Sequence, residues 1–234
     1  PGPVLIDIPK DILNQKSDWI EPGPLELPGY KPTLDPNPKM IQQAANLIKN
    51  SKKPILYVGG GIIHSKANKE LFDLATKFNI PVVTTLMGRG AFPDGHELCL
   101  EMPGMHGNYT ATTSIQKSDL LIAIGVRFDD RVTANPSFFA QNAKVIHADI
   151  DPAEIGKVRE AQVPIVGDAK SVILGLIEAL QDEELDTKNW INELNSMKTE
   201  HPLSYNQDEN GPLKVPFVLE ELQDLTEEEA IVVS

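Results

Sequence analysis

Four charged residues of both signs stand directly behind one apolar segment of this chain. The segment DLLIAIG (119–125) has the composition of a buried strand, and Arg127, Asp129, Asp130 and Arg131 follow it. An arginine can pair with phosphate or carboxylate through two parallel hydrogen bonds, or stack on a flat ring. An acidic side chain at a strand end can accept hydrogen bonds from ribose hydroxyls. These residue types predict binding of a dinucleotide-like anion.

Other residues suited to such a ligand follow the remaining apolar segments. Glycines let backbone N–H groups approach a phosphate closely, and a helix N-terminus favours an anion. Because parallel strands end at one edge of a sheet, we expect these residues to lie together. They are Gly59–Gly61, Thr84, Thr85, Leu86, Met87, the loop 103–108, Gly125, Arg127, Asp129, Arg131, Asp149, Ile150, Asp151, Gly167 and Asp168.

Each of these residues also has a purely structural explanation. The three glycines 59–61 are compatible with a simple tight turn, and Asp168 stands where a helix N-cap is wanted. Asp151 before proline is an ordinary helix start, and His106 fits a loop residue without a ligand. His147 lies inside a predicted strand, so we expect a hydrogen-bonded core histidine there.

The charged residues have a structural alternative as well. Arg127 and Arg131 could be tied to Asp129 and Asp130 as surface ion pairs, each worth little. What favours a ligand is that all the candidates fall on one predicted edge.

Apolar segments alternate with amphipathic ones along most of the chain. Segments that are apolar throughout, separated by helices, indicate a parallel sheet covered on both faces. We therefore predict an α/β fold over 37–182, with a doubly wound, mostly parallel, Rossmann-like sheet. We expect five or six strands and assign six. The predicted strands are 53–58, 81–85, 119–125, 144–150 and 163–167. The predicted helices begin at Asn37, Ser65, about 107, Asp168 and Asp186, with a helical turn at 152–158.

The flanking segments differ in composition from this central part. Six prolines in 22–38 predict an extended, semi-rigid linker. Because the chain begins with Pro1, and because PVLIDIP (3–9) and AIVVS (230–234) are both strand-like, we expect a piece of a longer protein.

Composition excludes several classes of function. The formal net charge of −13 repels phosphate backbones, so nucleic-acid binding as the main role is not expected. The single cysteine, Cys99, supports neither a disulfide framework nor a Cys-x-x-Cys metal site, and it favours a reducing compartment. No membrane-spanning or signal segment is predicted. No nucleophile triad and no metal-binding motif are present.

Six stretches carry a resemblance to the large catalytic subunits of the acetolactate synthase (acetohydroxyacid synthase) family, which are thiamine-diphosphate enzymes. The combination of GMHG with GxRFDDRVT is the most specific part. Pyruvate oxidases and related enzymes share the implied fold but resemble this chain less. The matching stretches, in the family's order and spacing, are GPVLIDIPKD (2–11), PILYVGGGI (54–62), PVVTTLMGRGAFP (81–93), GMHGNYTA (104–111), DLLIAIGVRFDDRVT (119–133) and HADIDPAEIGK (147–157).

The resemblance implies a domain plan. Residues 1–21 would end the pyrimidine-binding domain, 22–36 would be the linker, and 37–182 would be the central FAD-binding domain. Residues 183–234 would be a helical linker and the start of the diphosphate-binding domain. The thiamine-activating glutamate and the magnesium motif belong to missing parts, so we assign no catalytic residue and no metal ligand here.

The resemblance also implies roles for individual residues. Arg131 and Met105 match positions near the second 2-ketoacid, and Asp130 would orient Arg131. Pro103 stands where the family usually has leucine, so it receives no flavin contact. Positions that line FAD are Gly59, Gly60, Gly61, Thr84, Leu86, Gly104, Met105, His106, Gly125, Arg127, Asp129, Asp149, Ile150 and Asp168.

The implied parent enzyme condenses two pyruvates, or pyruvate with 2-ketobutyrate, with loss of carbon dioxide, in branched-chain amino-acid (isoleucine and valine) biosynthesis. It would use thiamine diphosphate, magnesium and FAD, form a homodimer or tetramer, leave room for a regulatory small subunit, and reside in the cytoplasm or a plastid. This piece alone is expected to be inactive. Two alternatives stay open: a sensory module that binds ADP or NAD, and a non-catalytic structural domain.

Overall fold

The computed structural model describes residues 4–24, 29, 31–208, 210–227 and 230–231. The chain divides into two units, residues 1–31 and 32–234. The described residues of the first unit form one short helix, α1 (Lys10–Leu13), with exposed residues on both sides. The expected strand over 3–9 is not formed by residues 4–9, and residue 3 lies outside the described part. For the expected strand over 230–234, only 230 and 231 are described, and neither is in a strand.

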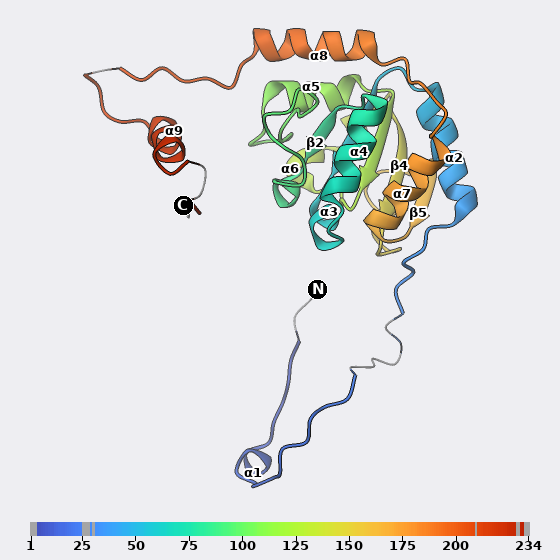
Figure 1. Cartoon of the computed structure of the whole chain (residues 1–234), viewed down its shortest axis with the longest axis vertical. Helices are drawn as coiled ribbons and strands as arrows, with labels where there is room; N and C mark the ends of the chain where they lie inside the picture. The colour runs from blue at the N-terminus through green and yellow to red at the C-terminus, as the bar shows by residue number, and fades with distance from the viewer. Residues whose placement is uncertain (1–3, 25–28, 30, 209, 228–229, 232–234) are drawn as a thin grey trace. The chain divides into compact units, whose positions relative to one another are not determined.

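The second unit is built on five parallel strands in the order β2-β1-β3-β4-β5. Figure 1 labels β2, β4 and β5. All neighbouring pairs are parallel, and every residue of β1 and β3 is buried. This confirms the predicted α/β class, because only a sheet covered on both faces requires strands that are apolar throughout. The strands are β1 (Pro54–Val58), β2 (Val82–Thr84), β3 (Leu120–Ile124), β4 (Lys144–Asp149) and β5 (Val163–Val166).

The described sheet has five strands rather than the assigned six, and an irregular segment lies beside β2. The N–H of Val82 donates to the Leu98 carbonyl, and the N–H of Leu100 donates to the Val82 carbonyl, each at 2.8 Å. Val82 and Cys99 form a single parallel bridge. The pairing stops at Glu101, because its φ of +64° takes the chain out of the extended region.

Helices connect the strands and flank the sheet. The predicted N-cap at Asn37 is confirmed, since its side chain accepts the N–H of Lys39 and Pro38 opens the helix. Three helices begin later than predicted, at 68, 109 and 188, and 152–158 forms turns and a bend rather than a helical turn. The remaining elements are α2 (Pro38–Asn50), α3 (Gly60–His64), α4 (Asn68–Phe78), η1 (Leu86–Gly88), α5 (Tyr109–Lys117), α6 (Asp130–Thr133), η2 (Pro136–Phe138), α7 (Ala169–Ala179), α8 (Lys188–Glu200) and α9 (Val215–Leu225).

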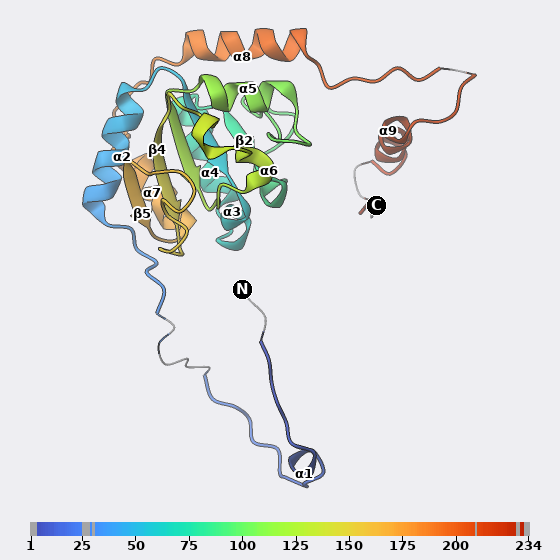
Figure 2. The ribbon, with the colours of Figure 1, turned by 180° about the vertical axis from the view of Figure 1, so that it is seen from behind.

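Alternate side chains of each central strand enter two separate hydrophobic clusters. Leu56 and Val58 pack with α2, α4 and α7, whereas Ile55 and Tyr57 pack with α5 and α8 on the opposite face. Figures 1 and 2 show the two faces of this arrangement. The sheet is therefore the rigid support on which the strand ends are presented at one edge. No helix among the described residues has the length and apolarity needed to cross a membrane.

Helix α8 belongs to the second cluster. Trp190 is 1% exposed, and its indole N–H donates to the Pro54 carbonyl at 3.1 Å. Leu194 and Met197 are buried beside it. The predicted domain bounds stay a prediction, but the sheet packs against a helix that lies beyond residue 182.

Candidate functional site

The ends of β1 and β3 meet through their backbones at the carboxyl edge of the sheet. Val58 pairs with Ile124 as the last register pair. Beyond it, the N–H of Gly59 donates to the Ile124 carbonyl at 3.2 Å, and that of Gly61 donates to Gly125 at 3.3 Å. The first turn of α3 therefore lies against the turn that follows β3.

Four glycines lie at this contact, at positions 59, 60, 61 and 125, and three of these positions require glycine. A Cβ on Gly61 would lie 2.6 Å from Gly125 Cα, and one on Gly59 would overlap the Gly125 carbonyl. Gly125 itself has a φ of +62°, in the left-handed region. At Gly60, by contrast, the nearest atom is Met87 Cβ at an ordinary 3.4 Å. The tight-turn explanation thus accounts for Gly59 and Gly61, while packing does not demand glycine at 60.

The charged turn after β3 is anchored by an aromatic residue. Phe128 is 1% exposed and adopts a φ of +53°, although Arg127, Asp130 and Arg131 around it are exposed. Among the described residues, neither Arg127 nor Arg131 forms an ion pair. The alternative of surface ion pairs is therefore not observed, and two guanidinium groups remain available to an anion.

Asp129 and Asp130 open helix α6. The Asp129 carboxylate accepts the N–H of Arg131 at 3.0 Å, and this hydrogen bond lowers the pKa of Asp129, assisted by the nearby arginines. Asp130 starts the helix, and its carbonyl accepts the N–H of Ala134 at 2.8 Å. Since no ion pair joins the Asp130 carboxylate to Arg131 within the described part of the chain, the α6 backbone holds Arg131, and the orienting role of Asp130 stays a prediction.

The loop 103–108 is fastened to the same turn. The N–H of Met105 donates to the Arg131 carbonyl at 2.9 Å. Gly104 has a φ of +99°, and a Cβ there would lie 2.5 Å from the Arg131 carbonyl. Met105 is 67% exposed and His106 is exposed next to it. The structure therefore brings together Met105 and Arg131, the two residues predicted to share a substrate.

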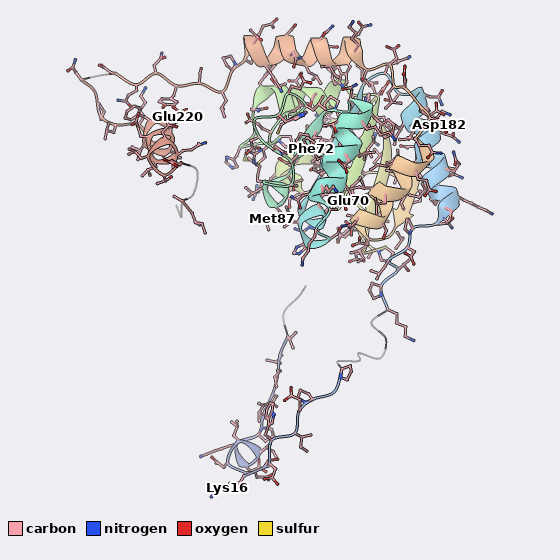
Figure 3. The ribbon with its side chains drawn as sticks, in the orientation of Figure 1. Lys16, Glu70, Phe72, Met87, Asp182 and Glu220 are labelled. Carbon is pink, nitrogen blue, oxygen red and sulfur yellow. The ribbon has the colours of Figure 1, made fainter. Side chains whose placement is uncertain are left out.

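Beyond β2, exposed apolar residues continue this edge. Leu86 and Met87 in η1 are each 71% exposed, and Met87, labelled in Figure 3, lies against Gly60. Thr84 is fully buried, and its hydroxyl accepts a hydrogen bond from Arg89 Nη1 at 3.2 Å. Arg89 also pairs with Asp94 at 2.8 Å. Sequence reasoning missed Arg89, although its position between two glycines just after β2 was a usable signal.

The carboxylates at the ends of β4 and β5 already accept hydrogen bonds from nearby backbone N–H groups. The Asp149 side chain accepts the N–H of Asp151 at 2.9 Å, and partial burial raises the pKa of Asp149. Asp168 accepts the N–H groups of Lys170 at 3.0 Å and Ser171 at 3.4 Å, which confirms the expected N-cap. Ile150, which follows Asp149 in the chain, is 43% exposed.

His147 is the core histidine that its place in a strand predicts. Its Nε2 lies 2.8 Å from the Val126 carbonyl, and its Nδ1 accepts the N–H of Gly156 at 3.4 Å. This pair of partners corresponds to a neutral imidazole protonated on Nε2. Burial lowers the pKa of His147, so the ring stays neutral inside the sheet edge.

A dependence of stability on pH follows from His147. Because its pKa is lower in the folded chain than the ordinary value of about 6.5, the unfolded chain takes up the proton first. The stabilisation that the neutral His147 ring provides is complete above the ordinary pKa, and it is lost as the pH falls below that value. We expect the unfolding free energy, from urea titrations at pH 7.5 and 5.5, to fall less in His147→Gln than in the parent chain, by at most about 1.4 kcal/mol for the pH unit below the ordinary pKa.

The exposed His64 supplies the matched control, because His64→Gln should keep the full decline. Because His147 itself lowers the pKa of Asp149, the difference reports His147 together with its effect on that neighbouring carboxyl. Equal declines in His147→Gln and the parent chain would contradict this prediction.

The arrangement can bind a flat anion, but it does not suggest proton or acyl transfer. Two unpaired guanidinium groups, an open glycine and exposed apolar side chains lie on one edge. In the described segments, no group of three or more His, Cys, Asp or Glu residues gathers in a way that could hold a metal ion. The acidic residues at this edge of the sheet mainly cap helices and turns.

Comparison with known proteins places this edge in context. Residues 41–176 match the model of the thiamine pyrophosphate enzyme central domain. The chain is 50% identical to an acetolactate synthase of Mycobacterium leprae, over all of this chain and 38% of the relative. It is 50% identical to the acetolactate synthase large subunit of Corynebacterium glutamicum, over 95% of this chain and 36% of the relative. It is 44% identical to the chloroplastic acetolactate synthase 1 of Nicotiana tabacum, over 99% of this chain and 35% of the relative. The chain thus spans less than two fifths of the length of these curated relatives.

Proposed function

Because this chain belongs to the thiamine pyrophosphate enzyme family, through the central domain of that family, we propose that it is the FAD-binding central part of an acetolactate synthase. The whole enzyme would condense two pyruvates, or pyruvate with 2-ketobutyrate, and release carbon dioxide. The relatives that support this proposal carry that enzyme's name and align along nearly the whole chain.

The observation that carries the flavin proposal is the unpaired, exposed Arg127 at an edge with exposed apolar residues. A pyrophosphate needs cations and open backbone, which Arg127 and Gly60 provide. A flat ring needs exposed apolar contact, which Leu86 and Met105 provide. The residues present therefore fit FAD. In the proposed condensation FAD takes no net redox part.

Not every predicted flavin contact fits equally well. Thr84 is buried and already bonded to Arg89, so Arg89 is better placed than Thr84 to reach a ligand. Asp168 already accepts two backbone N–H groups. We therefore propose that Arg127, Gly60 and the exposed apolar residues supply most of the binding free energy.

The substrate part of the proposal concerns Arg131, Met105 and Asp130. A 2-ketoacid carries a carboxylate, which an exposed guanidinium pairs with through two hydrogen bonds, and methionine offers an adaptable apolar wall. Thiamine diphosphate with magnesium would supply the carbanion chemistry from other parts of the enzyme. The proposed assembly is a homodimer or tetramer, open to a regulatory small subunit, in the cytoplasm or a plastid.

Flavin binding by this chain is directly measurable. FAD should raise the melting temperature of the purified chain more than ADP or NAD does at equal concentration. Arg127→Ala should weaken FAD binding 10- to 100-fold, because a charge-assisted hydrogen bond contributes about 1.5–3 kcal/mol. Lys144→Ala, which removes an exposed cation at the opposite end of β4, should leave the affinity unchanged.

Two results would overturn this proposal in different ways. Stronger stabilisation by ADP or NAD would favour the sensory nucleotide-binding module. A folded chain that takes up none of the three ligands would favour the structural domain, with Arg127 as a solvated surface residue.

A further inference from the structure

We infer that Phe128 is a positioning residue, whose buried ring anchors the turn after β3 and so determines where Arg127, Asp129 and Arg131 are presented. The inference rests on the proposed function only in the ligand that it assigns to those three residues. The anchoring itself is a property of the turn.

The backbone of Phe128 is held in a conformation that a bulky residue rarely adopts. Its φ is +53°, which for an aromatic side chain signals a strained position that the surroundings must maintain. The surroundings are the rings of Tyr57, Phe139 and His147, with centroids 5.6, 6.1 and 5.0 Å from that of Phe128. These tilted and edge-on contacts secure the ring on three sides.

The turn is also secured at Val126, two residues before Phe128. His147, which packs edge-on against Phe128, also bonds through Nε2 to the Val126 carbonyl at 2.8 Å. His147 of strand β4 therefore holds the turn at two points, the backbone carbonyl of Val126 and the ring of Phe128. Because Gly125 and Phe128 both have positive φ, the chain reverses tightly there, and the residues on either side of the ring remain exposed.

The position of Phe128 is transmitted along the chain by specific hydrogen bonds. The next residue, Asp129, accepts the Arg131 N–H and thereby starts α6. The Arg131 carbonyl then accepts the Met105 N–H at 2.9 Å. One buried ring thus fixes the cap, the arginine after it and the loop that carries Met105. A substitution at 128 should displace all three without removing any group that contacts a ligand.

The first test needs no ligand. In the parent chain the Arg131 N–H lowers the pKa of the Asp129 carboxyl, and NMR titration of aspartate side chains measures that pKa directly. We expect Phe128→Ala to return the pKa of Asp129 to its ordinary range, and Phe128→Leu, which keeps an apolar anchor, to move it less. Phe72→Ala, a change on α4 across the sheet, should leave it unchanged. These pKa values describe folded chains, so a merely destabilising substitution would not move them.

The second test asks whether the effect of Arg127 on FAD affinity depends on the Phe128 ring. If Phe128 positions Arg127, then Arg127→Ala should cost 10-fold or more in FAD affinity in the parent chain, but less than about 2-fold in Phe128→Ala. Equal costs in both backgrounds, with an unchanged Asp129 pKa in Phe128→Ala and Phe128→Leu, would overturn the inference. If Phe128→Ala does not fold, Phe128→Leu decides both readouts. A parent chain that binds no FAD would defeat the proposed function, while the Asp129 titration would still decide the role of Phe128.

Discussion

Alanine in place of Gly125 is expected to lower the unfolding free energy of this chain by about 2–5 kcal/mol. Two costs add at this position. The φ of +62° penalises any Cβ by about 1–2 kcal/mol. The new methyl group would also lie 2.6 Å from Gly61 Cα, and such overpacking costs about 1–3 kcal/mol. Because neither backbone can retreat without breaking the Gly61 to Gly125 hydrogen bond, the change should also disorder the rim.

Two other glycines separate these costs. Gly90 has a φ of +83°, and no atom lies within 4 Å of the place that a methyl group would take, so Gly90→Ala should carry only the conformational cost, about 1–2 kcal/mol. Gly95 has neither a positive φ nor a close neighbour, so Gly95→Ala should stabilise the chain by about 0.4–1 kcal/mol through the unfolded state. Urea unfolding followed by circular dichroism measures all three. A loss at Gly125 no larger than that at Gly90 would show that the two strand ends can separate freely.

The sheet was readable from sequence because burial on both faces leaves a strong local signal. All five predicted strands are present, at 54–58, 82–84, 120–124, 144–149 and 163–166. The assigned number of six was wrong: among the described residues the sheet has five strands, and the segment beside β2 adds only a single bridge at Cys99, with the positive φ of Glu101 ending the pairing. That conformation is not encoded in residue type.

The candidate site at the carboxyl edge of the sheet could only partly be predicted from the sequence. Strand ends predict which residues reach the edge, since the parallel topology brings them there. The turn after β3 was harder, because Phe128 stands among charged residues in a pattern typical of an exposed loop, whereas its left-handed backbone turns the ring inward. The hydrogen bond from Arg89 to Thr84 likewise depends on how η1 folds back over β2.

Helix α8 shows what a periodic pattern leaves open. The stripe of Trp190, Ile191, Leu194 and Met197 predicts a helix with an apolar face; Ile191 is half-buried and the other three residues are buried. The pattern does not say which surface that face covers, because the partner, the end of the sheet near Pro54, is more than a hundred residues away in the chain. A domain boundary at residue 182, drawn from the alternation of segments and from the resemblance, leaves out this helix although it packs on the sheet.

Trp190→Ala should remove about 3–5 kcal/mol of unfolding free energy, as expected for deleting a fully buried indole. The change leaves a cavity between α8 and the sheet, frees the Pro54 carbonyl, and removes the ring over which Lys53 Nζ lies at 5.0 Å. Urea unfolding followed by far-ultraviolet circular dichroism measures the loss. Trp19→Ala is the matched control, because Trp19 is 83% exposed and its removal should change stability by less than about 0.5 kcal/mol. Similar values for the two variants would mean that α8 folds apart from the sheet and that the domain ends near residue 182. A large difference would make α8 part of the domain that carries the rim.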